Sequence, residues 1–157
     1  MDQYREDLKQ SLDDAIAEVL ERRYRQLQSK RNPLTDAWLK GLYLFHCRGE
    51  SMGDIAHKIG LKAQYQVSRL LQLKAMRADI RQAMLQILAQ RVSDSLKLML
   101  SPERLAQLDR QIETILAEQV DDLLERAAIE ASASRNCSHH SLYTRRLCQC
   151  LSQRVSP

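Results

Sequence analysis

The side chains best suited to specific chemistry lie between residues 62 and 72, in a segment with the apolar spacing of a helix. Its inward stripe holds Ala63, Val67, Leu70 and Leu71, its outward stripe holds Tyr65, Ser68, Arg69 and Gln72, and Lys62, Gln64 and Gln66 flank its start. Arginine suits the two acceptors of guanine, glutamine suits adenine, and serine or tyrosine can hydrogen-bond phosphate or base. The outward stripe therefore has the composition of a surface that contacts nucleic acid.

The preceding residues predict the support for this helix. Ser51 is placed as an N-cap with Asp54 three residues later, and Ile55, Ala56 and Ile59 form one apolar side. Gly60 supplies the backbone freedom of a sharp turn. The pattern predicts a helix-turn-helix, the unit that lays its second helix in the DNA major groove. Two packed helices with an ordinary solvated face would give the same apolar pattern, so that interpretation stays open.

A wider set of residues surrounds this unit. They are Trp38, Leu39, Leu42 and Leu44, then Gly49, then Ser51 through Ala56, then Ile59, Gly60 and Leu61, then Val67, Ser68 and Leu70. In this order, the run from Leu34 to Arg77 resembles region four of bacterial sigma factors. The resemblance implies a domain that reads promoter DNA. The interval from Gly60 to Val67 is one residue longer than in that family, and one residue rotates a helix by about 100°. The resemblance therefore implies which face of the helix meets DNA, but not which residue contacts which base.

Composition predicts an all-α fold, a helix-turn-helix domain followed by a long helical hairpin or extension. The chain has 157 residues, only four Gly and three Pro, and no β-branched alternation. We expect an N-terminal amphipathic helix in residues 1–31, the sigma-like unit in 32–76, a hairpin in 77–131 and a basic tail with a short helix in 132–157. Trp38 and Phe45 are expected to anchor the core, and the methionines after residue 75 to pack inside rather than bind partners.

Charge is distributed unevenly along a chain whose net charge is +4. Residues 32–76 carry six Lys or Arg against three Asp or Glu, whereas 101–131 carry three against eight, and 132–157 carry four arginines and no acid. The positive unit would attract phosphate, unless these charges are solvated faces scattered in space. The basic tail could clamp DNA or dock on the acidic helix of residues 101–131, and docking is the preferred expectation.

Cysteine and histidine residues near the C-terminus raise the question of a zinc site. Cys137, His139, His140, Cys148 and Cys150 fall within 14 residues, but their spacing is not that of paired zinc knuckles. We therefore expect no metal and no cofactor. A disulfide is also not expected, because the chain lacks a signal peptide core and an apolar run long enough for a membrane, which favours the reducing cytoplasm.

An enzyme is not expected, since the sequence holds no phosphate loop, no metal-ligand pair and no nucleophile motif. The single histidines His46 and His57 are expected at the surface or its boundary rather than in a catalytic site. The sequence predicts a cytoplasmic, sequence-specific DNA-binding protein that regulates transcription. Its partners would be double-stranded DNA and either RNA polymerase or a second copy of itself, with no membrane. The alternatives are a helical adaptor that binds protein without reading DNA, and a piece of a larger factor.

Overall fold

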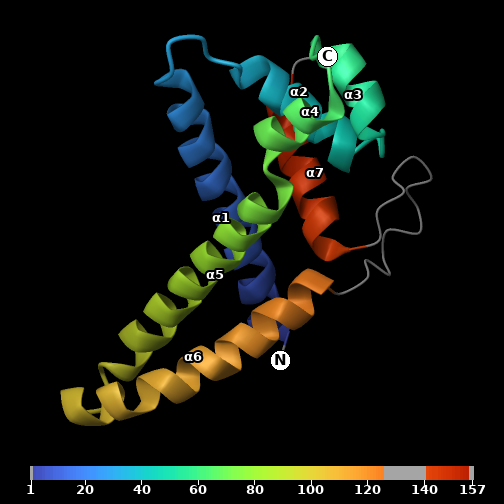
Figure 1. Ribbon diagram of the computed structural model, residues 1–157. Helices are drawn as coiled ribbons and strands as arrows, with labels where there is room; N and C mark the ends of the chain where they lie inside the picture. The colour runs from blue at the N-terminus through green and yellow to red at the C-terminus, as the bar shows by residue number, and fades with distance from the viewer. Residues whose placement is uncertain (1, 126–140, 156–157) are drawn as a thin grey trace.

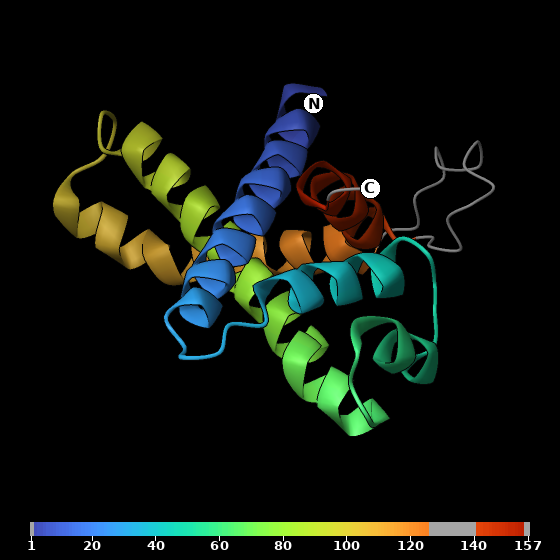
Figure 2. The same cartoon turned by 90° about the horizontal axis from the view of Figure 1, so that it is seen from above.

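The computed structural model describes residues 2–125 and 141–155, which form helices and contain no strand. The helices are α1 (Asp2–Gln28), α2 (Thr35–His46), α3 (Met52–Ile59), α4 (Gln64–Leu71), α5 (Leu73–Leu96), α6 (Pro102–Glu125) and α7 (Leu142–Arg154). The all-α prediction is confirmed for this part of the chain. No helix in it is long and apolar enough to cross a membrane. Figures 1 and 2 both place α3 and α4 at one end of the molecule and the α5–α6 turn at the other.

The core is centred on α1 and α5, which pack on one another more extensively than any other helix pair. Amphipathic spacing puts the apolar side of α1 inside. The fully buried side chains of the two helices include Leu12, Ile16, Leu20, Met76, Ile80 and Met84. The expectation that the methionines pack inside is confirmed for Met76 and Met84, whereas Met99 is 79% exposed.

Helices α5 and α6 form the antiparallel hairpin that the Ser-Pro pair predicts. Ser101 Oγ accepts a hydrogen bond of 3.4 Å from the Arg104 amide, and Pro102 begins α6. Across the hairpin, Arg81 Nε lies 2.6 Å from Asp121 Oδ1. The Arg81 guanidinium, by donating to this carboxylate, holds the pKa of Asp121 below its usual value.

The hairpin is buried in only half of its length. The second half of α6 is packed inside through Leu116, Val120, Leu123 and Leu124. At the far end, Leu98 and Met99 are 90% and 79% exposed. The molecule therefore has one end of the hairpin built into the core and one end that is free.

Helix α7 closes the core by packing on α1, α2 and α6. Leu147 and Leu151 are fully buried, and Arg77 lies over the Tyr143 ring with its guanidinium carbon 4.8 Å from the centroid. Burial raises the pKa of the Tyr143 phenol to about 12, against the lowering effect of the neighbouring Arg77 and Arg23.

One expectation about the C-terminal region is wrong, and another is met only in part. Cys47, at the end of α2, and Cys148, on α7, form a disulfide with their Cα atoms 5.3 Å apart. The sequence argument considered only the cellular compartment, whereas packing of α7 on α2 brings together cysteines 101 positions apart. Helix α7 packs on the acidic helix α6, as expected for the tail, but its arginines pair with α1: Arg146 lies 3.5 Å from Asp13 and Arg154 3.6 Å from Glu21.

Three smaller points concern histidines, metal and a helix break. His46 is only 6% exposed, so the expectation of a surface or boundary position is wrong. Its side chain lies on the buried side of α2. Cys137, His139 and His140 lie outside the described residues, and the described residues contain no cluster of three metal-ligating side chains. The helical chain breaks between α4 and α5 at Gln72, whose φ is +46°.

Candidate nucleic-acid interface

Helix α3 and its turn have the construction that the sequence predicts. Ser51 Oγ accepts a 3.2 Å hydrogen bond from the Asp54 amide and caps the helix start. Gly60 ends the helix with φ at +79°, and the Leu61 amide donates back to the Ala56 carbonyl at 2.8 Å. Since a left-handed residue is required here, the glycine determines the direction in which the chain leaves α3.

The start of α4 is capped by one of the predicted contact residues. Ala63 stands at the N-cap and offers no side-chain acceptor. Gln66 replaces it: its Oε1 accepts from the Lys62 amide at 2.8 Å and from the Ala63 amide at 3.2 Å. The side chain of Gln66 is half-buried and folded onto the turn, so it holds the helix in place and offers only its remaining amide hydrogens to a partner.

Helix α4 is seated by two apolar residues and a close approach to α2. Val67 and Leu71 are fully buried. A Cβ atom added to Gly41 of α2 would lie 2.9 Å from Leu71 Cδ2, so the absent side chain makes room for α4. The predicted inward stripe is confirmed at Val67 and Leu71, while Ala63 and Leu70 are half-buried.

The outer face of α4 carries exposed polar side chains. Tyr65 is 61% exposed, and Ser68 and Arg69 are exposed beside it. The Arg69 guanidinium carbon lies 5.5 Å from the centroid of the Tyr65 ring, a cation–π contact that orients both side chains. Lys62 and Gln64 are exposed at the start of the helix. The structure therefore brings five of the seven predicted residues together in solvent.

Gln72, the seventh predicted residue, has a different position. It is the left-handed joint between α4 and α5, and its Oε1 accepts a 2.8 Å hydrogen bond from Arg23 Nη1. Arg23 Nη2 in turn lies 2.7 Å from Asp79 Oδ2 on α5. These contacts connect α1 with the joint and with α5, so Gln72 fixes the angle between α4 and α5 while remaining exposed.

Sequence reasoning missed Arg23 and Asp79, the two residues that hold this joint. They are 56 positions apart and lie on helices whose pairing no local pattern specifies. From the sequence alone, Arg23 cannot be told apart from the other charged residues of α1 that face solvent. In the structure, its side chain is only 13% exposed. Knowledge of the α1–α5 packing is needed to identify it.

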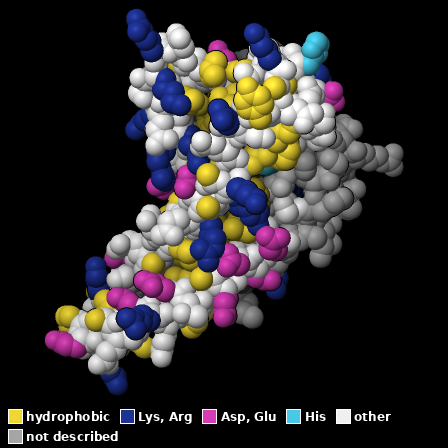
Figure 3. Space-filling view, in the orientation of Figure 1, with side chains coloured by type: hydrophobic (Ala, Val, Ile, Leu, Met, Phe, Trp, Pro, Cys, Tyr) yellow, Lys and Arg dark blue, Asp and Glu magenta, His cyan; other side chains and the backbone are white. Residues whose placement is uncertain are grey.

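The electrostatic surroundings of α4 are positive. Between Asp54 and Asp79 the chain has no acidic residue and five Lys or Arg. Two of these are paired, Lys58 with Glu50 at the turn before α3 and Arg77 with Glu125 of α6. In Figure 3, Lys and Arg side chains predominate over the end that carries α2–α4, and most acidic side chains lie over α5 and α6. Such a field attracts a polyanion.

The outer face of α4 is accessible. The helix packs on α2 and α3, and Figure 2 shows it at the edge of the molecule, while Figure 1 shows α6 at the end away from it. An α-helix with its side chains is about 10–12 Å across, which fits the major groove of about 12 Å, and the eight residues of α4 supply about two exposed turns.

Comparison with protein-family models, with curated proteins and with solved structures finds no match to this chain. The likeness to sigma region four therefore rests on the residue pattern from Leu34 to Arg77.

Proposed function

We propose that this chain binds double-stranded DNA through the outer face of α4 and regulates transcription from the bound site. The observation that carries the proposal is the joint exposure of Tyr65, Ser68 and Arg69 on a helix seated by the buried Val67 and Leu71. Protein surfaces that read bases need polar side chains on a rigid support, and both parts are present here.

Each contact residue has a role that follows from its chemistry. Arg69 is the candidate for guanine, because its guanidinium matches the two major-groove acceptors of that base. Ser68 and Tyr65 hydrogen-bond bases or phosphates beside it, and Lys62 and Gln64 meet phosphate near the helix start. Gln66 and Gln72 position the helix, since their amide oxygens already accept hydrogen bonds from the turn and from Arg23.

The sigma-like pattern extends the proposal to partners. Region four acts beside RNA polymerase, so polymerase is one candidate for the surface of the α5–α6 hairpin, and a second copy of this chain is the other. We place the action of the protein in the cytoplasm, where bacterial DNA lies.

A helical adaptor without DNA reading is the second candidate. Leu98 and Met99 at the far end of the hairpin favour it, because two neighbouring apolar side chains exposed at 90% and 79% are available for contact with protein. The two functions are compatible, since α4 and the hairpin end lie at opposite ends of the molecule.

Salt dependence separates the two candidates. Fluorescence anisotropy with a labelled random-sequence duplex should show affinity that falls steeply as salt rises. Lys62→Ala should weaken binding to all duplexes alike and reduce the salt slope by about one, whereas Lys97→Ala, at the far end of the hairpin, should change neither. Absence of binding at 50 mM salt, or equal effects of both substitutions, would reject DNA reading by α4.

A further inference from the structure

An apolar stripe along α6 is only partly covered by the other helices of the chain. Its members follow the 3-4-3 spacing of a heptad and are Leu105, Leu108, Ile112 and Ile115. Ile115 is 54% exposed, and the other three are half-buried. Toward the end of α6, Val120 and Leu124 are buried instead. The outer stripe of α6 therefore keeps apolar surface that the chain's own core does not use.

A row of polar side chains borders this stripe. Arg104, Gln111 and Glu118 recur every seven residues, so they lie on one side of α6, next to Leu108 and Ile115. All three are exposed. Among the described residues, the ion pairs of α6 involve Asp121 and Glu125, whereas Arg104 and Glu118 form none. The row thus has a cation near one end, an amide in the middle and an anion near the other end.

Such a row is complementary to itself when it is reversed. If two copies of α6 pair in antiparallel orientation around Gln111, Arg104 of each copy lies opposite Glu118 of the other. The two Gln111 side chains, which can both donate and accept hydrogen bonds, then meet at the two-fold axis. The same register forms apolar layers between the copies, in which Leu105 faces Ile115 and Leu108 faces Ile112. Charge and apolar spacing therefore agree on one register.

We propose that the outer stripe of α6 is a dimer interface, occupied by a second copy of this chain in antiparallel orientation. The paired segment, residues 104–118, is about 21 Å long at 1.5 Å per residue. The exposed turn with Leu98 and Met99 comes to lie at the level of the second half of the partner's α6, which extends the contact. A contact of this size is small, so the dimer is reversible, with a dissociation constant on the order of 1–10 µM.

The two α4 helices of this dimer lie far apart. Arg77, near the joint of α4 and α5, pairs with Glu125 at the end of α6. Glu125 lies fourteen residues beyond Gln111, so the two joints are separated by about 40 Å along α6. Because α4 lies beyond the joint, its two copies are farther apart than the roughly 34–36 Å between half-sites one helical turn apart. The dimer therefore joins two separate DNA sites, a consequence that rests on the proposed function.

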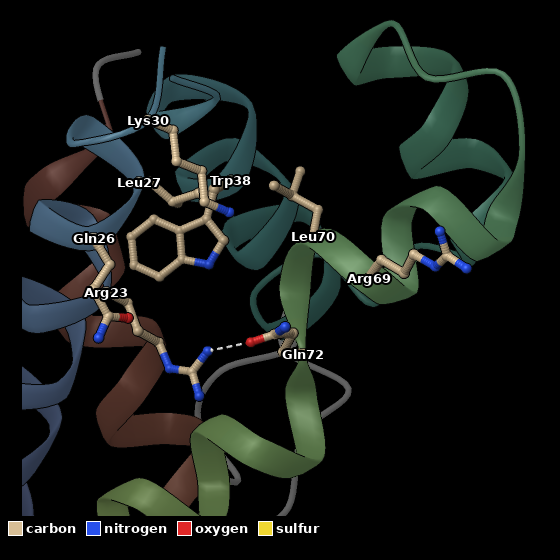
Figure 4. A pocket seen from close by; sticks show the side chains of 8 residues that line it. All are labelled: Arg23, Gln26, Leu27, Lys30, Trp38, Arg69, Leu70 and Gln72. Carbon is tan, nitrogen blue, oxygen red and sulfur yellow. Dashed lines mark hydrogen bonds between the residues drawn. The ribbon is translucent and has the colours of Figure 1, made fainter. Parts of the chain in front are cut away.

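The joint between α4 and α5 keeps each reading helix in a fixed direction. Figure 4 shows the pocket at this joint, with the hydrogen bond from Arg23 to Gln72 and the Arg69 guanidinium directed away from it. Since Arg23 also pairs with Asp79 on α5, the hairpin that forms the dimer and the helix that carries Arg69 are held together. Dimerisation itself requires no DNA.

Sedimentation equilibrium of the full-length protein without DNA tests the interface directly. The unchanged protein is compared with Arg104→Glu, with Glu118→Arg and with the protein that carries both substitutions. Arg110→Glu is the matched control, because it makes the same charge change at an exposed arginine on another side of α6. Circular dichroism during thermal unfolding shows that each variant is folded.

We expect each single reversal at Arg104 or Glu118 to weaken the dimer about tenfold, since two-fold symmetry turns it into two like-charge contacts. The double reversal restores the opposite charges and should return the dissociation constant to within about threefold of the unchanged protein, and Arg110→Glu should leave it unchanged. A protein that is monomeric at tens of micromolar, equal effects of Arg104→Glu and Arg110→Glu, or a double reversal as weak as the single ones would overturn the proposal.

Binding to a duplex with one site is measured separately, with the unchanged protein and with Arg104→Glu. A dimer that binds no duplex would refute the proposed function and leave the interface standing. A monomer that binds the duplex would refute the interface and leave the proposed function standing.

Discussion

The outer face of α4 and the far end of the α5–α6 hairpin are both exposed, but they differ in chemistry and in support. The face of α4 is polar and is carried by a helix whose Val67 and Leu71 are fully buried. The hairpin end is apolar at Leu98 and Met99 and is remote from the core formed by α1, α5 and α7. A polar surface on a rigid support suits nucleic acid, whereas an apolar surface on a projecting hairpin suits protein.

The contrast also shows how burial is divided within one hairpin. Met84 on α5 is fully buried between the packed helices, and Met99, after the end of α5, is 79% exposed. The same residue type therefore stabilises the fold at one position and is available to a partner at the other. Substitutions in the buried core and at the exposed hairpin end should therefore have different effects.

The largest expected effect comes from the buried methionine. Met84→Ala should lower the free energy of unfolding by about 3 kcal/mol, because it leaves a cavity in the core. Met99→Ala should change it by less than about 0.5 kcal/mol, since an exposed side chain loses little by truncation. Urea denaturation followed by circular dichroism measures both. Similar costs at the two positions would mean that the hairpin end is buried in solution.

The second effect concerns association through the hairpin end. If two copies meet there, Leu98→Asp should weaken the dimer by about 2 kcal/mol, because it removes one apolar anchor and adds a charge. Light scattering over a concentration series measures the dissociation constant. A monomer at tens of micromolar in the unchanged protein, a range typical of weak association, would eliminate the second copy and leave polymerase or another protein as the partner.

Gly60 tests the support of α4. Gly60→Ala should cost about 1 kcal/mol of folding free energy, because φ is +79° there and the added Cβ would meet no atom within 4 Å, so that the cost is entirely in the backbone. Gly53→Ala, inside α3, should be neutral or stabilising, since alanine favours a helix and the added Cβ would be tight only against the flexible end of the Gln64 side chain at 3.2 Å, with Ser51 Oγ at an ordinary 4.0 Å. A destabilising Gly53→Ala with a neutral Gly60→Ala would contradict the turn geometry.

The smallest effect is expected at the ion pair that crosses the hairpin. Asp121→Asn should cost about 0.5 kcal/mol at pH 7, because both partners are substantially exposed. The pKa of Asp121 is lowered in the folded protein, so the contribution is present above the ordinary carboxyl pKa and is lost as the pH falls through the folded value. Thermal unfolding should thus distinguish the two proteins at pH 7 and not at pH 2. A difference that persists at pH 2 would assign the effect to packing.

Much of the fold could be predicted from the sequence because the signals are local. The Ser51 cap, the Gly60 turn and the Ser101-Pro102 helix start each depend on a few adjacent residues, and each is present. The outward position of Tyr65, Ser68 and Arg69 follows from the helical period alone.

The remaining features depend on contacts between distant segments. Arg23 reaches Gln72 and Asp79 only because α1 packs on α5, and Cys47 meets Cys148 only because α7 packs on α2. Gln66 has a helical position that predicts an outward side chain, but the absence of an acceptor at Ala63 turns it onto the backbone. Local patterns carry no information on any of these contacts.

The central claim is that the exposed side chains of α4 read DNA sequence. Selection of bound sites from a pool of random duplexes, performed with the unchanged protein and with Arg69→Ala, tests it most directly. We predict an enriched sequence, with Arg69→Ala costing on the order of 1–3 kcal/mol on the selected site and relaxing the preference at one guanine position. Recovery of no enriched sequence, or of the same sequence with the same preference from both proteins, would contradict this account.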